Sequence, residues 1–334
     1  MNIVVIGAGV MGAGIAAQIA NAGFKVSLLD IVLASNADRN ILAKNAIAKL
    51  GSALMCPEFS ENIIPGNLED DLKILSEADW IIEVIIEKLA IKQDLYKKLE
   101  QYCKPSCIIS SNTSTIPLLK LIEGRNKQFK RNFLITHFFN PPRNMQLLEL
   151  VTSQHTDKEV IKIVTDFIDI ALEKTVIKSN DTPGFIANRI GCYFLETALT
   201  IALEMEISVE EADGVLGKPV GIPKTAIFGL YDLIGLDVMK LISASLISAL
   251  NSYDDFALMS KSHQLLEQMI KDGFVGRKGK GGFYRIIVDE KGNKIKEVIN
   301  LKTGVYAQAT EMVLPINGAK DIFAHNNYAY TAHK

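Results

Sequence analysis

The segment GAGVMGAG occupies residues 7–14 and directly follows the apolar run NIVVI at residues 2–6. A short apolar run predicts a buried β-strand, and the alanine-rich stretch from Met11 to Ala22 predicts a helix. The glycines therefore fall in the tight turn between a first strand and a first helix, which is the setting of the dinucleotide-binding fingerprint. There the backbone approaches a pyrophosphate at the free amides of the helix N-terminus. The residues that we assign to this loop are Gly7, Gly9, Val10, Met11 and Gly12.

Asp30 ends the second predicted strand, KVSLL, and lies 18 residues after Gly12. A carboxylate at this place is expected to bind the ribose hydroxyls of the adenosine, and it would repel the additional phosphate of NADP. Glycines alone would also suit a tight turn that holds no ligand. With Asp30 in this position, we predict that the loop binds NAD.

The composition is that of an ordinary globular protein. The chain has 334 residues, of which 48% are apolar and 22% charged, with a net charge of −2. This length predicts two domains. The charge balance, without a basic stripe, argues against a nucleic acid partner. Because we find neither a signal peptide nor a membrane span near the N-terminus, we expect a cytoplasmic protein that does not enter a membrane.

Cysteines and histidines give no sign of a metal site. The four cysteines lack the paired spacing of metal ligands and suit a reducing compartment. No two of the five histidines are spaced as ligands on one helix. We therefore predict that the protein binds no metal.

The pattern of elements changes near residue 180. Before it, short aliphatic runs alternate with helical stretches, which predicts an α/β fold of the Rossmann type with a mostly parallel, doubly wound sheet. After it, the helical period dominates, as in the predicted helix from Phe256 to Lys271, and predicts a second, all-helical domain. A short β-hairpin is expected around residues 290–293. We accordingly predict an NAD-binding domain over residues 1–180, a helical domain over 181–300 and a tail without clear pattern over 301–334.

Three later stretches place polar groups among apolar ones: SSNTST at 110–115, THFFNPP at 136–142 and DTPGFIANRIG at 181–191. Oxidation of an alcohol requires a base that takes the hydroxyl proton as the hydride leaves, and histidine is the usual choice. His137 ends an apolar strand, where open α/β sheets bind their ligands. Glu149 is a candidate to orient its ring.

Ser114 and Asn188 are candidates to hydrogen-bond the substrate oxygen. Each stretch also has a simpler interpretation, because His137 between apolar residues could be a packed core histidine and Glu149 a surface charge. The serines and threonines could be a helix cap, and the Asp-Thr-Pro-Gly segment a turn between domains.

Taken together and in their order, these stretches resemble the 3-hydroxyacyl-CoA dehydrogenase family, from Met1 to about Tyr284. The family has the same Ser-Asn-Thr-Ser segment, the His-Phe-Phe-Asn-Pro segment with a glutamate twelve residues after its histidine, and the Asp-x-Pro-Gly-Phe segment. The resemblance implies oxidation of an (S)-3-hydroxyacyl-CoA to the 3-ketoacyl-CoA with NAD, a step of fatty acid β-oxidation. It implies His137 as general base, Glu149 as its orienting partner, Ser114 and Asn188 as substrate-positioning groups, and Glu87, Lys92, Asn140 and Lys278 as cofactor contacts.

The resemblance is greatest to the dehydrogenase portion of long bacterial fatty-oxidation members. It leaves two arrangements open: a homodimer through the helical domain, or a piece of a longer multifunctional chain. Two other functions also remain open. A β-hydroxyacid dehydrogenase of another type would rely on a lysine base, and a non-catalytic NAD-binding relative would keep the fold without turnover.

Overall fold

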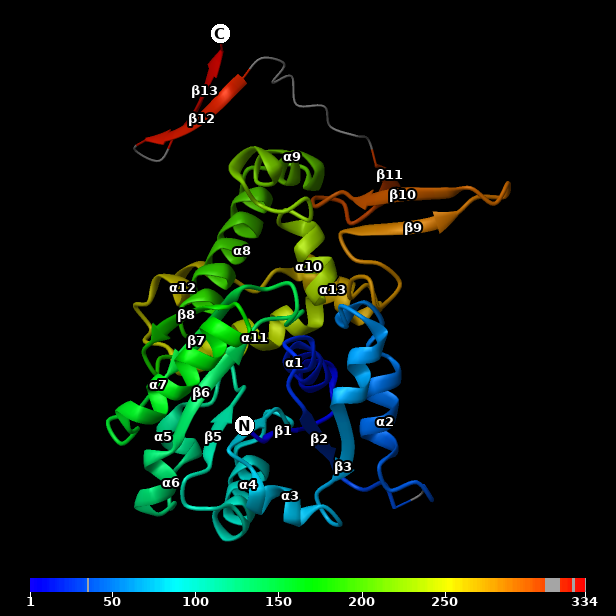
Figure 1. Cartoon of the computed structure of the whole chain (residues 1–334). Coiled ribbons are helices and arrows are strands. Elements are labelled where there is room, and N and C mark those ends of the chain that lie inside the picture. The colour runs from blue at the N-terminus through cyan, green and yellow to red at the C-terminus, as the bar shows by residue number, and fades with distance from the viewer. Residues whose placement is uncertain (35, 310–318, 326–327, 334) are drawn as a thin grey trace. The chain divides into compact units, whose positions relative to one another are not determined.

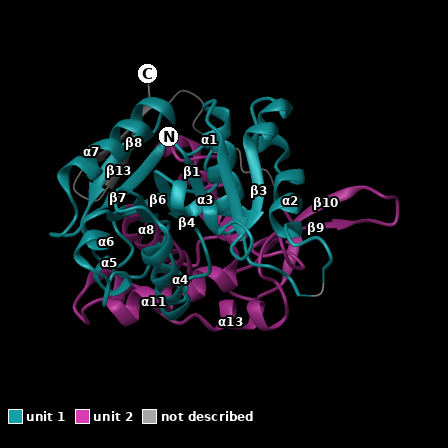
Figure 2. Ribbon diagram, turned by 60° about the horizontal axis from the view of Figure 1, so that its bottom comes forward, with its two compact units in different colours: residues 1–186 teal, residues 187–334 magenta. Residues whose placement is uncertain are grey.

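The computed structural model describes residues 1–34, 36–309, 319–325 and 328–333. The chain divides into two compact units, residues 1–186 and 187–334, which Figure 2 shows in two colours.

The first unit is built around one eight-stranded sheet with the order β3-β2-β1-β4-β5-β6-β7-β8. The six strands from β3 to β6 are parallel neighbours, β7 pairs antiparallel with β6, and β8 pairs parallel with β7. The predicted Rossmann-type, mostly parallel sheet is thus confirmed. The strands are β1 (Ile3–Ile6), β2 (Val26–Asp30), β3 (Ile63–Asn67), β4 (Trp80–Glu83), β5 (Ile108–Ser111), β6 (Phe133–Phe138), β7 (Leu147–Val151) and β8 (Thr175–Ser179).

Helices cover both faces of this sheet (Figure 1). Strand side chains alternate between the faces, so that Ile3 and Val5 pack into one core and Val4 and Ile6 into the other. The first core includes α1, α2 and α7, and the second includes α3, α4, α5 and α6. The α-helices are α1 (Val10–Asn21), α2 (Ile41–Ala48), α3 (Leu72–Glu77), α4 (Leu89–Tyr102), α5 (Leu118–Leu121), α6 (Lys127–Arg131) and α7 (Lys158–Asp166). Two 3-10 helices, η1 (Gly51–Ala53) and η2 (Pro57–Asn62), and one π-helix, η3 (Phe167–Ala171), accompany them.

The strand order places the glycine loop at the point where the chain reverses its direction of winding. From β1 the chain winds outward to β2 and β3, and it then returns to form β4 on the other side of β1. The loops after β1 and β4 therefore diverge, and such a switch point is where doubly wound sheets bind their ligands.

The second unit is helical up to Lys271 and packs around one apolar core of its own. One predicted helix is divided: the run from Phe256 to Lys271 forms α12 and α13, separated by residues 260–263. The helices are α8 (Ala187–Glu204), α9 (Val209–Val215), η4 (Lys218–Val220), α10 (Phe228–Ile234), α11 (Leu236–Ala249), α12 (Asp255–Met259) and α13 (Gln264–Lys271).

A small antiparallel sheet follows these helices. The hairpin expected around residues 290–293 is present, because β9 (Tyr284–Val288) pairs antiparallel with β10 (Lys294–Ile299). Strand β11 (Tyr306–Gln308) adds to its other side. A separate pair, β12 (Ala319–His325) with β13 (Tyr328–His333), lies in the tail for which the sequence predicts no structure. The second unit is therefore helical with these added strands.

Candidate functional site

The glycine loop leaves no room for side chains at two of its three motif glycines. Gly7 has φ +110, and a Cβ there would lie 2.5 Å from the carbonyl oxygen of Val84. A Cβ on Gly12 would lie 1.7 Å from the carbonyl oxygen of Gly7, so helix α1 begins against the loop. A Cβ on Gly9, in contrast, would meet nothing within 4 Å. The loop is thus tightly packed on its inner side and open at Gly9, as the close approach of a pyrophosphate requires.

The start of α1 offers free backbone amides to an anion. The helix begins at Val10, with Met11 as its second residue and Gly9 as its N-cap. No side chain caps it, and its first turn carries no acidic residue. Val10 is 77% exposed. No acidic residue of the first turn therefore offsets the positive end of the helix dipole, and the loop fits a dinucleotide phosphate.

Asp30 lies beside this loop at the end of β2. One carboxylate oxygen accepts the N–H of Ala8 at 2.6 Å, and the other accepts the N–H of Ile31 at 2.7 Å. The carboxylate therefore links the loop after β1 to the end of β2, where a ribose of a bound dinucleotide would lie.

His137 and Glu149 face each other across two adjacent strands. They are directly paired in the antiparallel register of β6 and β7. The Nδ1 atom of His137 lies 2.7 Å from Oε2 of Glu149, and both side chains are buried. The second carboxylate oxygen, Oε1, accepts the N–H of Ile186 at 2.9 Å. This arrangement fixes the imidazole ring and leaves its Nε2 as the nitrogen that Glu149 does not bind.

The segment before Ile186 has an unusual backbone that supports this pair. Gly184 has φ 76, and the next residue, Phe185, has φ 51, although it is not glycine. The Phe185 ring packs edge-on against the His137 ring at 5.6 Å between centroids. Phe139 contacts the same imidazole at 4.5 Å. A left-handed backbone at a bulky residue is costly, and such strain is concentrated at functional sites.

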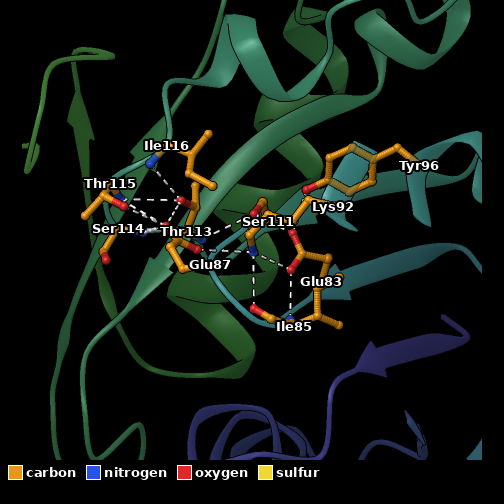
Figure 3. Close-up of polar contacts among 10 residues, drawn as sticks. All are labelled: Glu83, Ile85, Glu87, Lys92, Tyr96, Ser111, Thr113, Ser114, Thr115 and Ile116. Carbon is orange, nitrogen blue, oxygen red and sulfur yellow. Dashed lines mark hydrogen bonds and ion pairs between the residues drawn. The ribbon is translucent and has the colours of Figure 1, made fainter. Parts of the chain in front are cut away.

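Glu87 and Ser114 come together at the ends of β4 and β5. Oε1 of Glu87 accepts hydrogen bonds from the hydroxyls of Thr113 and Thr115, the latter at 3.0 Å, and from the N–H of Ser114 at 3.2 Å. In Figure 3 the Ser114 hydroxyl points away from the carboxylate. Burial alone would raise the pKa of Glu87, but the charge of Lys92 and the two threonine hydroxyls outweigh it and hold the pKa below its usual value.

Lys92 lies inside the first unit, with its side chain only 1% exposed. Its ammonium group lies 2.6 Å from Glu83, 3.3 Å from Glu87 and 3.3 Å from the carbonyl oxygen of Ile85. It donates hydrogen bonds to Glu83 and to the Ile85 carbonyl oxygen, and it forms an ion pair with Glu87. The structure thus places Lys92 next to Glu87, as an internal partner of two carboxylates (Figure 3).

Three further predicted site residues lie on other segments of the chain. Asn140 follows β6 and is exposed, and its peptide bond to Pro141 is cis. Asn188 and Lys278 belong to the second unit. Asn188 lies in the first turn of α8, and the Lys278 ammonium group forms an ion pair with Asp237 at 2.7 Å.

The described residues contain neither a metal-binding cluster nor a membrane-spanning helix. No group of three or more His, Cys, Asp or Glu side chains there could hold a metal ion. None of the helices within those ranges combines the length and the apolar character that crossing a bilayer requires.

Sequence reasoning missed several polar residues that surround Glu87 and Lys92. The available signal was a single carboxylate inside the otherwise apolar run WIIEVII, because an isolated charge in a buried strand must find a partner. The missed residues are Glu83, Tyr96, Ser111, Thr113 and Thr115.

Comparison with known families covers both units. Residues 2–182 match the model described as 3-hydroxyacyl-CoA dehydrogenase, NAD binding domain, and residues 184–286 match the model for the C-terminal domain of the same family. The first unit therefore contains the NAD-binding domain of that family.

Similar proteins carry related names. A putative fatty acid oxidation complex trifunctional enzyme of Rickettsia prowazekii is 46% identical over 98% of this chain, which spans only 46% of that relative's length. A probable 3-hydroxyacyl-CoA dehydrogenase of Deinococcus radiodurans is 43% identical over 86% of this chain and 83% of its own length. Among solved structures, Mycobacterium tuberculosis FadB2 superposes with a TM-score of 0.73 at 27% identity, over 85% of this chain and 98% of its own.

Proposed function

Because this chain belongs to the 3-hydroxyacyl-CoA dehydrogenase family, we propose that it oxidises (S)-3-hydroxyacyl-CoA to 3-ketoacyl-CoA with NAD, as a step of fatty acid β-oxidation. The observation that carries this proposal is the buried pair of His137 and Glu149 at the carboxyl end of β6, within a domain whose glycine loop fits a dinucleotide. NAD, when bound, accepts the hydride that leaves the hydroxyl-bearing carbon.

His137 is the general base of this reaction. Glu149 binds Nδ1, so the neutral ring presents the lone pair of Nε2 to the substrate hydroxyl and takes its proton there. The ring becomes positively charged as it takes the proton, and the carboxylate 2.7 Å away stabilises that charge. Burial of both side chains strengthens this interaction and excludes water.

Ser114 and Asn188 position the substrate oxygen by hydrogen bonding, as the family resemblance implies. The Ser114 hydroxyl points away from the Glu87 carboxylate, which supports this assignment (Figure 3). Around the cofactor, we assign Asp30 to the adenosine ribose, and Glu87, Asn140 and Lys278 to direct contacts. Lys92, whose ammonium group is enclosed by acceptors of the chain, acts through Glu87.

The wider organisation is also part of the proposal. Residues 1–180 bind NAD, and the helical residues 181–300 contribute to substrate binding. Either the helical domain pairs two copies of this chain, or the chain is a piece of a longer multifunctional one. The trifunctional name and the greater length of the Rickettsia relative support the second arrangement. We place the reaction in the cytoplasm.

The direct test is formation of NADH, followed by absorbance of the reduced ring, when purified protein is mixed with NAD and 3-hydroxyacyl-CoA substrates of short, medium and long chain. We expect turnover with at least one of them. NADH binding without turnover on any chain length would reject the dehydrogenase and favour the non-catalytic NAD-binding relative.

A further inference from the structure

Glu83 is a buried carboxylate that none of the roles assigned above requires. It ends strand β4 and is 0% exposed. Its Oε1 accepts the N–H of Ile85 at 2.8 Å and the Lys92 ammonium group at 2.6 Å. Its Oε2 accepts the hydroxyls of Tyr96 at 2.5 Å and Ser111 at 2.7 Å. Glu83 thus joins β4, the loop after it, helix α4 and strand β5 at one point (Figure 3).

Lys92 connects Glu83 to Glu87 by pairing with both carboxylates. The Lys92 ammonium group lies 2.6 Å from Glu83 and 3.3 Å from the Glu87 carboxylate. Glu83 therefore fixes the position of the positive charge that attracts Glu87. An ammonium group without Glu83 would have Glu87 as its remaining carboxylate partner, and buried charges demand close pairing. The Glu87 side chain would then be drawn toward Lys92.

Glu87 in turn organises the turn that carries Ser114. Its Oε1 accepts hydrogen bonds from the hydroxyls of Thr113 and Thr115 and from the Ser114 N–H. The Thr113 hydroxyl also accepts the N–H of Ile116 at 3.0 Å, which closes the turn. A displacement of the Glu87 carboxylate would therefore release this turn.

We propose that Glu83 is a positioning residue of the NAD site: through Lys92 it fixes the Glu87 carboxylate and, with it, the turn of Thr113, Ser114 and Thr115. This inference rests on the proposed assignment of Glu87 and Ser114 to cofactor and substrate. Stability alone gives little reason for the arrangement, because apolar residues of similar volume commonly replace a buried ion pair without loss.

The test compares three variants with the wild type. Glu83→Gln keeps the shape of the side chain and removes its charge. The double variant Glu83→Gln/Lys92→Met removes both charges of the buried pair, and it protects the test against misfolding of the single variant. Glu100→Gln is the matched control, because Glu100 also lies in α4 and pairs with Arg125 at 3.1 Å, outside this network.

Three readouts separate positioning from stability: the melting temperature, NADH affinity from the change in its fluorescence, and amide hydrogen exchange of peptides that cover Thr113–Ile116. We expect Glu83→Gln to melt below the wild type, to bind NADH about tenfold more weakly and to exchange faster over that segment, because Lys92 then draws Glu87 away. The double variant leaves Glu87 without the ammonium group that Glu83 holds in place, so we expect a similar loss of affinity and faster exchange, with a melting temperature close to that of the wild type. Glu100→Gln should leave NADH affinity and this exchange unchanged.

Wild-type NADH affinity in the double variant would overturn the inference, whether or not exchange of the turn is faster. None of these readouts requires turnover. If the wild type binds NADH but oxidises no 3-hydroxyacyl-CoA, the proposed function fails, while the binding and exchange data still decide the role of Glu83.

Discussion

The two units hold their buried carboxylates in different ways. In the first unit, Glu83 pairs with Lys92 and Glu149 pairs with His137. In the second, Glu196, Asp213 and Asp232 are buried or nearly so, and over the described ranges none of them forms an ion pair; their hydrogen-bond partners are hydroxyls and backbone N–H groups.

The second unit uses these carboxylates to fasten its chain. Asp232 of α10 accepts the N–H groups of Phe283 and Tyr284 at 2.7 and 2.8 Å, and so ties that helix to the start of β9. Burial, only partly offset by these hydrogen bonds, raises the pKa of Asp232 to about 6. Burial likewise raises the pKa of Glu196 above its usual value, although the Ser243 hydroxyl opposes this.

The difference separates two uses of a buried acid. Where a cation accompanies it, as Lys92 accompanies Glu83, the buried acid forms part of an ion pair. Where only neutral donors accompany it, the acid serves connection and becomes sensitive to pH. The following predictions test this contrast.

The largest effect is expected at His137, the partner of Glu149. His137→Gln removes the base while glutamine still reaches Glu149, so we expect turnover to fall by roughly a hundredfold or more, ~3 kcal/mol or more in activation free energy. NADH affinity should change little. Steady-state rates and NADH titration measure the two quantities, and unchanged turnover would remove His137 from its role.

The next largest effect is expected on stability, where Glu83, which forms an ion pair, is compared with Glu196, which binds a neutral hydroxyl. Glu83→Gln leaves the Lys92 charge buried and should lower the free energy of unfolding by about 3 kcal/mol. Glu196→Gln strands no cation, and its side-chain oxygen still accepts from Ser243, so the loss should stay below about 1 kcal/mol. Urea unfolding near neutral pH compares them, and equal losses would contradict the distinction.

A smaller effect is expected from pH. The folded state holds the Asp232 proton more tightly than the unfolded state, because its pKa is about 6 when folded. Its contribution to stability is therefore complete below pH ~4 and is lost as the pH rises through about 6, a change of ~2–3 kcal/mol. Unfolding free energies of the wild type relative to Asp232→Asn should fall over this interval. A rise of this difference with pH would contradict a raised pKa of Asp232 in the folded state.

The smallest effect is expected at a surface pair. Lys162 and Asp166 lie 2.6 Å apart on α7, with both side chains about half exposed or more. Lys162→Met should leave the urea midpoint of unfolding essentially unchanged, because water screens an exposed pair. A loss as large as that of Glu83→Gln in the same urea assay would show that burial does not set the scale of these effects.

Much of the first unit was predictable because its signals are local. The apolar run before Gly7, the spacing to Asp30 and the change of period near residue 180 each follow from neighbouring residues. The pairing of His137 with Glu149 was also proposed from sequence, and their contact at 2.7 Å is now observed. The roles of the individual site residues remain predictions.

The rest depended on contacts that sequence does not display. Glu83 lies nine residues from Lys92 and 28 from Ser111, and only the fold brings these side chains together. The division of the predicted helix between Phe256 and Lys271 has no proline or glycine to announce it. The resemblance implied that Lys92 touches the cofactor, whereas only the structure reveals the acceptors that enclose its ammonium group.

The register of β6 and β7 has a consequence for how the chain can vary. His137 and Glu149 meet because they are direct partners in an antiparallel ladder. A slip of one residue would send one of the two side chains through to the opposite face of the sheet, so the dyad cannot drift apart by degrees. A change of length in residues 139–146 between the two strands therefore preserves this pair only where the loop absorbs it and leaves the alignment of the strands intact.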